Sequence, residues 1–184
     1  MGEKIELGLP KKLEFYDHGS SIEIVRPWFN WNIVFVVVCV MLWSIFFDDW
    51  SSDEGGIQIP ETYHSIIFIL VGIVLAYGFI ANLLNKTHIY VSEGMISIRK
   101  KPLPWFGNTD IDSSDVKQLF SKEVVTHSKN STHIYYEVQV ITNSGRDIKL
   151  VGRLDTSEQA LYIEQQIEKY LRIEDMPIQG EFGG

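Results

Sequence analysis

Cysteine is almost missing from this chain of 184 residues, because Cys39 is the only one. A single chain therefore forms no internal disulfide and offers no cysteine-based metal site. Basic residues are also few, with 16 Lys and Arg against 24 Asp and Glu. The resulting net charge of -8 argues against nucleic acid as a partner, since phosphate binding needs a basic face.

Sequence motifs of catalysis are missing as well. The chain has no nucleophile elbow, P-loop, dinucleotide-binding fingerprint or kinase signature. Its five histidines show no paired ligand spacing, although His127 and His133 could meet across a hairpin. We therefore expect a protein that is not an enzyme, with no catalytic residues, no metal and no cofactor.

Charged residues are absent from two long apolar runs, residues 28–47 and 66–84. A helix of about 20 residues is roughly 30 Å long, which matches the hydrocarbon core of a bilayer. Both runs could instead be helices of a soluble core, but such cores rarely hold two charge-free helices of this length. We predict a membrane α-helical hairpin with two spans, and hence the lipid bilayer as a partner.

Individual residues within the runs fit this prediction. Trp28, Trp31 and Trp50 lie near the ends of the first run, where indole rings favour the membrane interface. Gly72 and Ala76 form a small-xxx-small pair in the second run, which favours close packing of helix backbones, either within the hairpin or in a dimer. The lack of charge in either run argues against an ion pathway or proton relay.

The charges around the two runs predict their direction. The connector, residues 48–65, contains acidic residues and no Lys or Arg. Basic residues flank the runs on their other sides: Lys4, Lys11, Lys12 and Arg26 before the first, and Lys86, Arg99, Lys100 and Lys101 after the second. Because Lys and Arg stay in the cytoplasm during insertion, we predict a multi-pass inner-membrane protein of a bacterium with both termini cytoplasmic.

The rest of the chain alternates polar and apolar residues. Residues 1–27 predict an N-terminal cytoplasmic β-hairpin that turns at Asp17-His18-Gly19 and docks on a later sheet, because two strands alone are marginally stable. Residues 86–173 predict a series of antiparallel strands, with a polar loop at 126–132 and a tight turn at 143–145. Residues 174–184 are interpreted as a flexible tail.

A helix is predicted at the end of this domain, in the stretch "LDTSEQALYIEQQIEKYL". Asp155 or Thr156 is the expected N-cap, and the apolar residues recur at helical spacing. They form one face that consists of Ala160, Ile163, Ile167 and Leu171. Antiparallel strands closed by one C-terminal amphipathic helix are the order of a pleckstrin-homology-like (PH-like) β-roll, an α+β fold.

Four stretches carry a resemblance to a known family: "IEIVRPWFNW", "PLPWFGN", "KNST" and "LDTSEQALYIEQQIEKYL". With them the chain resembles a family of uncharacterised bacterial membrane proteins of about this length. The resemblance implies two spans with a cytoplasmic domain, and no known activity. The layout is also similar to that of photosystem I assembly proteins, in architecture only, since "PLPWFGN" and "KNST" are not motifs of that family.

The stretch "IRKKPLPWFGN" is the candidate contact surface. Arg99, Lys100 and Lys101 are candidates to meet anionic headgroups, and Trp105 and Phe106 to enter the membrane interface or grip a partner. In the alternative interpretation the basic triplet is only an orientation signal. The prolines at 102 and 104 then break a strand, Trp105 packs as core, and Gly107-Asn108 is a turn.

Together these features predict a membrane-anchored, non-enzymatic interaction or assembly module on the cytoplasmic face of the inner membrane. Its expected partner is another membrane protein or a second copy of the chain. One alternative is an anionic-lipid sensor that uses the basic and aromatic segment. Another is an accessory subunit of a membrane transporter or enzyme complex.

Overall fold

The computed structural model of the protein describes residues 8–29, 34, 37–39, 61–128 and 131–173. The chain divides into two compact units, one of residues 1–27 with 86–184 and one of residues 28–85. The predicted tail at 174–184, residues 48–60 of the predicted connector and most of the first apolar run lie outside the described residues.

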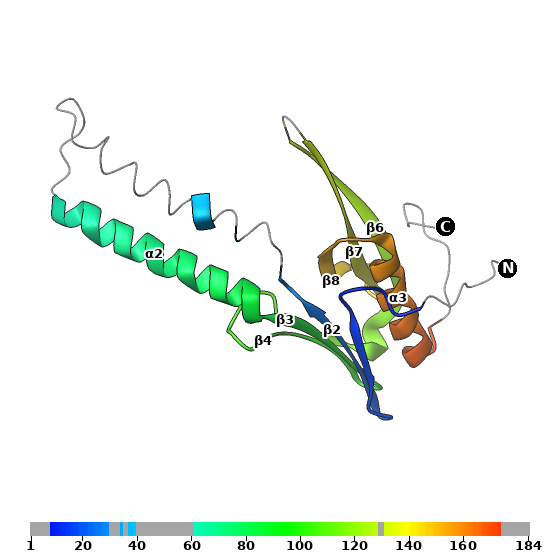
Figure 1. The fold of residues 1–184 in the computed structure, drawn as a ribbon. Helices are drawn as coiled ribbons and strands as arrows, with labels where there is room; N and C mark the ends of the chain where they lie inside the picture. Colours follow the sequence, from blue (N-terminus) through cyan, green and yellow to red (C-terminus); the bar gives the residue numbers. More distant parts are fainter. Residues whose placement is uncertain (1–7, 30–33, 35–36, 40–60, 129–130, 174–184) are drawn as a thin grey trace. The chain divides into compact units, whose positions relative to one another are not determined.

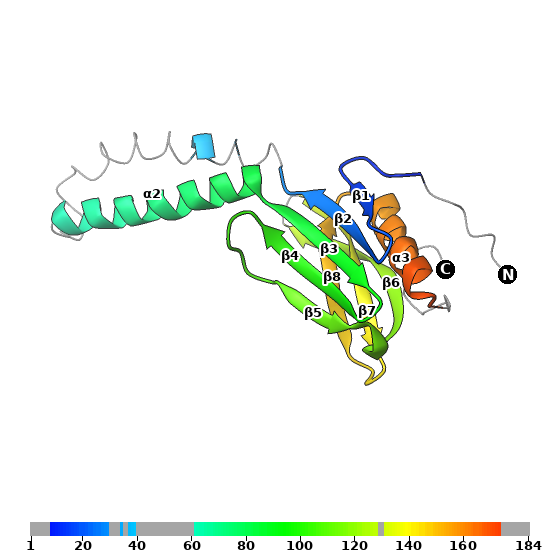
Figure 2. The same cartoon turned by 90° about the horizontal axis from the view of Figure 1, so that it is seen from below.

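Five antiparallel strands of the first unit form sheet A, in the order β1-β2-β3-β4-β5. Figure 2 shows these strands side by side. Their bounds are β1 Glu14–Asp17, β2 Ser21–Pro27, β3 Lys86–Ser92, β4 Met95–Lys101 and β5 Thr109–Asp112. The N-terminal hairpin therefore docks on the later sheet as predicted, through pairs between β2 and β3 such as Ile24 with Ile89.

The turn of this hairpin is where the sequence predicts it. The amide of Gly19 donates to the Asp17 carboxylate at 2.8 Å, and the amide of His18 donates to the carbonyl of Ser21 at 2.9 Å. Gly19 has a φ of 78°, a conformation that costs glycine little because it has no Cβ.

Sheet B has three antiparallel strands in the order β6-β7-β8: β6 Val116–Ser128, β7 Ser131–Thr142 and β8 Asp147–Leu154. A short 3-10 helix, η1 Ser113–Asp115, connects the two sheets. The expected polar loop at 126–132 is wrong, because His127 pairs with Thr132 and Ser128 with Ser131. The strands thus continue to Ser128 and from Ser131, and residues 129–130 lie outside the described residues.

The hairpin of β6 and β7 is longer than β8. β8 pairs with β7 only between Tyr136 and Ile141, so residues 124–128 and 131–135 form a two-stranded ribbon beyond the sheet. We call these residues the ribbon. In Figure 1 β6 and β7 extend past β8 as a long hairpin.

Helix α3, Ser157–Leu171, packs mainly on β6 and β7. Thr156 is its N-cap, and the Thr156 hydroxyl accepts from the amide of Gln159 at 3.4 Å. Arg172 ends the helix in the left-handed conformation, with a φ of 56°. The predicted apolar face is confirmed, since Ala160, Ile163 and Ile167 are fully buried and Leu171 is partly buried against the core.

One hydrophobic core joins both sheets and α3. Sheet A contributes inward-facing side chains, which include Ile24, Ile89, Ile96 and Ile98. Phe15 and Tyr162 meet edge-on, with ring centroids 6.4 Å apart, and so join β1 to α3. Antiparallel sheets packed against a C-terminal helix fit a PH-like α+β domain, as the sequence predicts.

The second unit contains α2, Glu61–Leu84, which includes the second predicted span, residues 66–84. Large hydrophobic side chains are exposed along it: Ile66, Ile69, Leu70, Val71, Ile73, Val74, Leu75, Tyr77, Ile80, Leu83 and Leu84. The structure leaves several side chains in the first half of α2 undescribed. Judged on the residues that it does describe, no helix is long and apolar enough to cross a membrane. The two spans therefore remain predictions.

The other residues expected in the membrane have the following positions. Gly72 and Ala76 are exposed, and a Cβ on Gly72 would meet no described atom within 4 Å. Trp28 is half-buried, and its amide donates to the carbonyl of Asn85 at 3.1 Å. Trp31 and Trp50 lie outside the described residues. A packing role for the small pair and an interfacial role for the tryptophans stay predictions.

Candidate functional site

Strand register places a row of polar side chains on the outer face of sheet A. Because side chains alternate between the two faces of a strand, residues that pair directly share a face. One row runs through all five strands: Tyr16, Glu23, Tyr90, Ser97 and Asp110. The neighbouring row contains Glu14, Val25, His88 and Arg99. The isoleucine and valine side chains of the core lie on the inner face.

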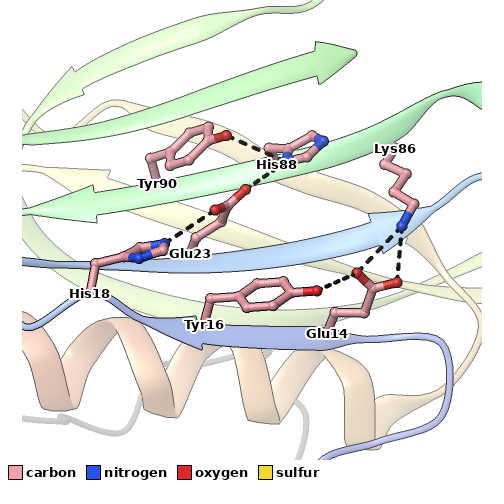
Figure 3. Close-up of polar contacts among 7 residues, drawn as sticks. All are labelled: Glu14, Tyr16, His18, Glu23, Lys86, His88 and Tyr90. Atoms are coloured by element: carbon pink, nitrogen blue, oxygen red, sulfur yellow. Dashed lines mark hydrogen bonds and ion pairs between the residues drawn. The ribbon is translucent and has the colours of Figure 1, made fainter. Parts of the chain in front are cut away.

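Glu23 on β2 is the centre of this surface (Figure 3). One Glu23 carboxylate oxygen lies 2.6 Å from Nδ1 of His88, and the other lies 3.4 Å from Nε2 of His18. The hydroxyl of Tyr90 is 3.4 Å from Nδ1 of His88, and the two rings stack with centroids 5.9 Å apart. Two histidines and one tyrosine thus converge on one carboxylate.

The electrostatics of Glu23 follow from these contacts. Burial by itself raises the pKa of Glu23, but the hydrogen bonds from His88, Tyr90 and His18 outweigh it and leave the pKa below its ordinary value. Burial, and then the nearby Glu23 carboxylate, raise the pKa of Tyr90. Glu23 is therefore ionised at neutral pH and is the anionic centre of the cluster.

A second carboxylate, Glu14 on β1, lies beside the first (Figure 3). Lys86 Nζ donates to Glu14 at 3.0 Å, and the hydroxyl of Tyr16 donates at 3.0 Å. These hydrogen bonds, that from Lys86 first, lower the pKa of Glu14. Side chains from β1, β2 and β3 are thereby cross-linked on the outer face, which fixes the hairpin on the sheet.

The basic triplet is divided between the two faces of sheet A. Arg99 is on the outer face, where it donates to the Asp110 carboxylate at 2.8 Å, and this hydrogen bond lowers the pKa of Asp110. Lys101 is on the same face and is exposed, with Nζ 5.4 Å from the centroid of the Tyr90 ring. Lys100 is on the opposite face, where burial, followed by the charge of Lys149, lowers its pKa.

The β4–β5 loop, residues 102–108, follows the triplet. Phe106 is 89% exposed, whereas Trp105 is half-buried. The alternative interpretation placed Trp105 in the core, and this is wrong, because Trp105 is not a member of the core. The two prolines do end β4, and Gly107, with a φ of 87°, makes the turn.

Several polar residues of the site were not predicted from the sequence. Glu14, Glu23 and His88 are separated by up to 74 positions, and only the strand register brings them together. The position of Lys100 could have been predicted from the sequence. Successive side chains of a strand point to opposite faces, which places Lys100 on the face opposite Arg99 and Lys101. Glu164 and Glu168 on α3 are buried, and the Ser121 hydroxyl donates to Glu164. A search for apolar periodicity does not find such carboxylates.

The outer face of sheet A offers hydrogen-bonding groups and charges to a partner. Among the described residues, no three His, Cys, Asp or Glu side chains form a group that could hold a metal ion. No protein-family model, curated protein or solved structure matches this chain. The resemblance to a family of two-span membrane proteins therefore stays a prediction.

Proposed function

We propose that this protein is a membrane-anchored, non-enzymatic interaction module. It holds its PH-like domain at the cytoplasmic face of the inner membrane and there binds another membrane protein. The observation that carries the proposal is the surface of α2, a helix of 24 residues. Its described part exposes eleven large hydrophobic side chains, between 36% and 70% each.

The magnitude of this exposure supports a cover over α2. A fully buried aliphatic side chain contributes about 1.5–3 kcal/mol, so eleven half-exposed ones in water forfeit on the order of 10 kcal/mol. That equals the whole free energy of unfolding of a typical domain. The charge-free run at 66–84 and the basic residues after it favour lipid as the cover.

The ribbon is the part of the domain best suited to bind a partner. Among the described strands, none pairs with the ribbon from outside, so a further strand has room to add along its edges. Val125 and Ile134 pair across it and are 43% and 52% exposed. An exposed apolar pair beside open strand edges suits an extended segment of a partner protein, added as a further strand.

Anchoring is tested by washing native membranes with alkaline carbonate. We expect the full chain to stay in the membrane pellet, and the variant with Ile73→Lys and Val74→Lys to be released. Lys117→Glu is the control, since Lys117 is exposed on β6, in the other unit. Release of the unsubstituted chain by carbonate would contradict anchoring.

Partner binding is tested by cross-linking in native membranes followed by purification. We expect one cross-linked species with the unsubstituted chain, and its loss with Val125→Glu and Ile134→Glu. Met95→Glu is the matched control, because Met95 is a strand residue that is 46% exposed and lies outside the ribbon. Equal cross-linking by the ribbon variant would show that the ribbon is not the partner surface.

A further inference from the structure

The β4–β5 loop presents an aromatic side chain to the outside. Phe106 at 89% is the most exposed of the large hydrophobic residues that the structure describes, and the next is Val74 at 70%. A single exposed apolar side chain is ordinary on a protein surface, so what distinguishes Phe106 is the loop that holds it and the position of that loop.

Contacts within the loop hold Phe106 in this position. Lys100 Nζ donates to the carbonyl of Phe106 at 2.5 Å, and the amide of Lys100 donates to the side-chain oxygen of Asn108 at 2.9 Å. Gly107 completes the turn in a conformation that favours glycine, and a Cβ there would lie 2.6 Å from Lys100 Nζ. The loop is thus closed around Lys100, and Phe106 is left outside.

The loop also lies at a defined end of sheet A. Lys101, the last residue of β4, pairs with Lys86, which in turn pairs with Pro27. Pro27 and Lys86 are the residues at which the chain leaves the domain for residues 28–85 and returns. Since neighbouring strands are about 5 Å apart, the loop begins within two strand widths of both junctions.

A cation accompanies the aromatic side chain at this end. Lys101 is exposed, and its described contact is with the face of the Tyr90 ring. Arg99 instead pairs with Asp110, and Lys100 is turned into the loop. Of the basic triplet, Lys101 is therefore the exposed cation at the end of β4 from which the loop with Phe106 begins.

We propose that the β4–β5 loop docks on the anionic surface of the bilayer, with Phe106 in the interfacial layer and Lys101 on phospholipid phosphate. An aromatic ring at headgroup depth and a cation near anionic lipid are both favourable there. This inference rests on the proposed membrane anchor. It adds a second contact, which fixes the orientation of the domain against the membrane.

The test uses the full chain with Cys39→Ser and one new cysteine, labelled with an environment-sensitive fluorophore. Phe106→Cys reports on the loop. Glu93→Cys is the matched control, because Glu93 is exposed in the β3–β4 turn at the opposite end of the same strands, about 20 Å away. Each protein is reconstituted into vesicles with phosphatidylglycerol, and lipids with a nitroxide on the acyl chain serve as quenchers.

We expect strong quenching of the probe at 106 and little at 93. Vesicles of phosphatidylcholine alone should weaken the quenching at 106. Lys101→Gln should lower the docking equilibrium constant about fivefold, the factor that one cation contributes beside an anionic bilayer. Lys117→Gln, an exposed lysine on β6, should leave it unchanged.

Three results would overturn the inference, and they are distinguishable. Equal, weak quenching at 106 and 93 in a protein that floats with the vesicles refutes loop docking and leaves the anchor intact. Equal quenching at 106 with and without phosphatidylglycerol, unchanged by Lys101→Gln, refutes the role of the anionic lipid. Failure of the protein to float with the vesicles refutes the anchor and this inference together.

Discussion

Replacing Glu23 with glutamine removes the charge at the centre of the outer face of sheet A and keeps the shape of the side chain. Glu23 is 15% exposed and His88 is 20% exposed, and their atoms are 2.6 Å apart. A hydrogen bond to a charged group in such a setting contributes about 1.5–3 kcal/mol. The pair with His18 is longer, at 3.4 Å, and His18 is 52% exposed, so it adds roughly 0–1 kcal/mol.

Glutamine retains one acceptor oxygen and so keeps part of the contact with His88. We therefore expect Glu23→Gln to lower the free energy of unfolding by about 1–2 kcal/mol near neutral pH. The pKa of Glu23 is below its ordinary value of 4.5 in the folded protein, since its hydrogen bonds outweigh its burial. Its contribution is therefore present above that value and is lost as the pH falls through the lowered pKa. The difference in the free energy of unfolding between the Glu23→Gln variant and the parent should therefore vanish in acid.

The measurement is urea denaturation of the full chain in detergent, followed by circular dichroism at neutral pH and at about pH 3. Glu93→Gln is the control, because Glu93 is an exposed turn residue. A double-mutant cycle with His88→Gln should give a coupling of about 1 kcal/mol between positions 23 and 88. A variant as stable as the parent at neutral pH, or an undiminished difference in acid, would refute the reasoning.

Three further changes test the fold around this site. Arg26→Ala removes the donors to the carbonyls of Gly152 and Arg153 and should cost about 1.5–3 kcal/mol, with faster hydrogen exchange in β8; unchanged exchange there would contradict the link. Thr156→Ala should lower the free energy of unfolding by about 1 kcal/mol, measured by urea denaturation, whereas Thr156→Ser, which keeps the capping hydroxyl, should leave it nearly unchanged. Ile163→Ala, at a fully buried position, should lower the free energy of unfolding by about 2–5 kcal/mol, and a loss below 1 kcal/mol would show that this contact is not part of the core.

Local patterns predicted the elements whose apolar residues face the core. The alternation around Ile22 and Ile24 and around Ile96 and Ile98 marks β2 and β4. The spacing of Ile163 and Ile167 marks α3 in the same way. The polar stretch at 126–128 was interpreted as a loop because it has no buried side, yet it is a strand held by register with β7 alone.

The polar cluster required information that is not local. Glu23 meets His88 because β2 pairs with β3 across 65 positions, and nothing in either segment alone indicates that partner. The basic triplet was predicted as one surface because its members are adjacent in sequence. Strand geometry separates neighbours to opposite faces, and this is why Lys100 closes a loop while Lys101 lies outside.

The pairing of Pro27 with Lys86 has a thermodynamic consequence for the two units. β2 and β3 form an antiparallel hairpin, and residues 28–85 are its connection. Lengthening such a connection from two residues to about 58 raises the entropic cost of closing it by about 3 kcal/mol. Any structure that keeps residues 28 and 85 adjacent, as the bond from the Trp28 amide to the Asn85 carbonyl does, removes part of that cost. Any order that keeps residues 28 and 85 adjacent therefore stabilises the pairing of β2 with β3, and its loss weakens that pairing.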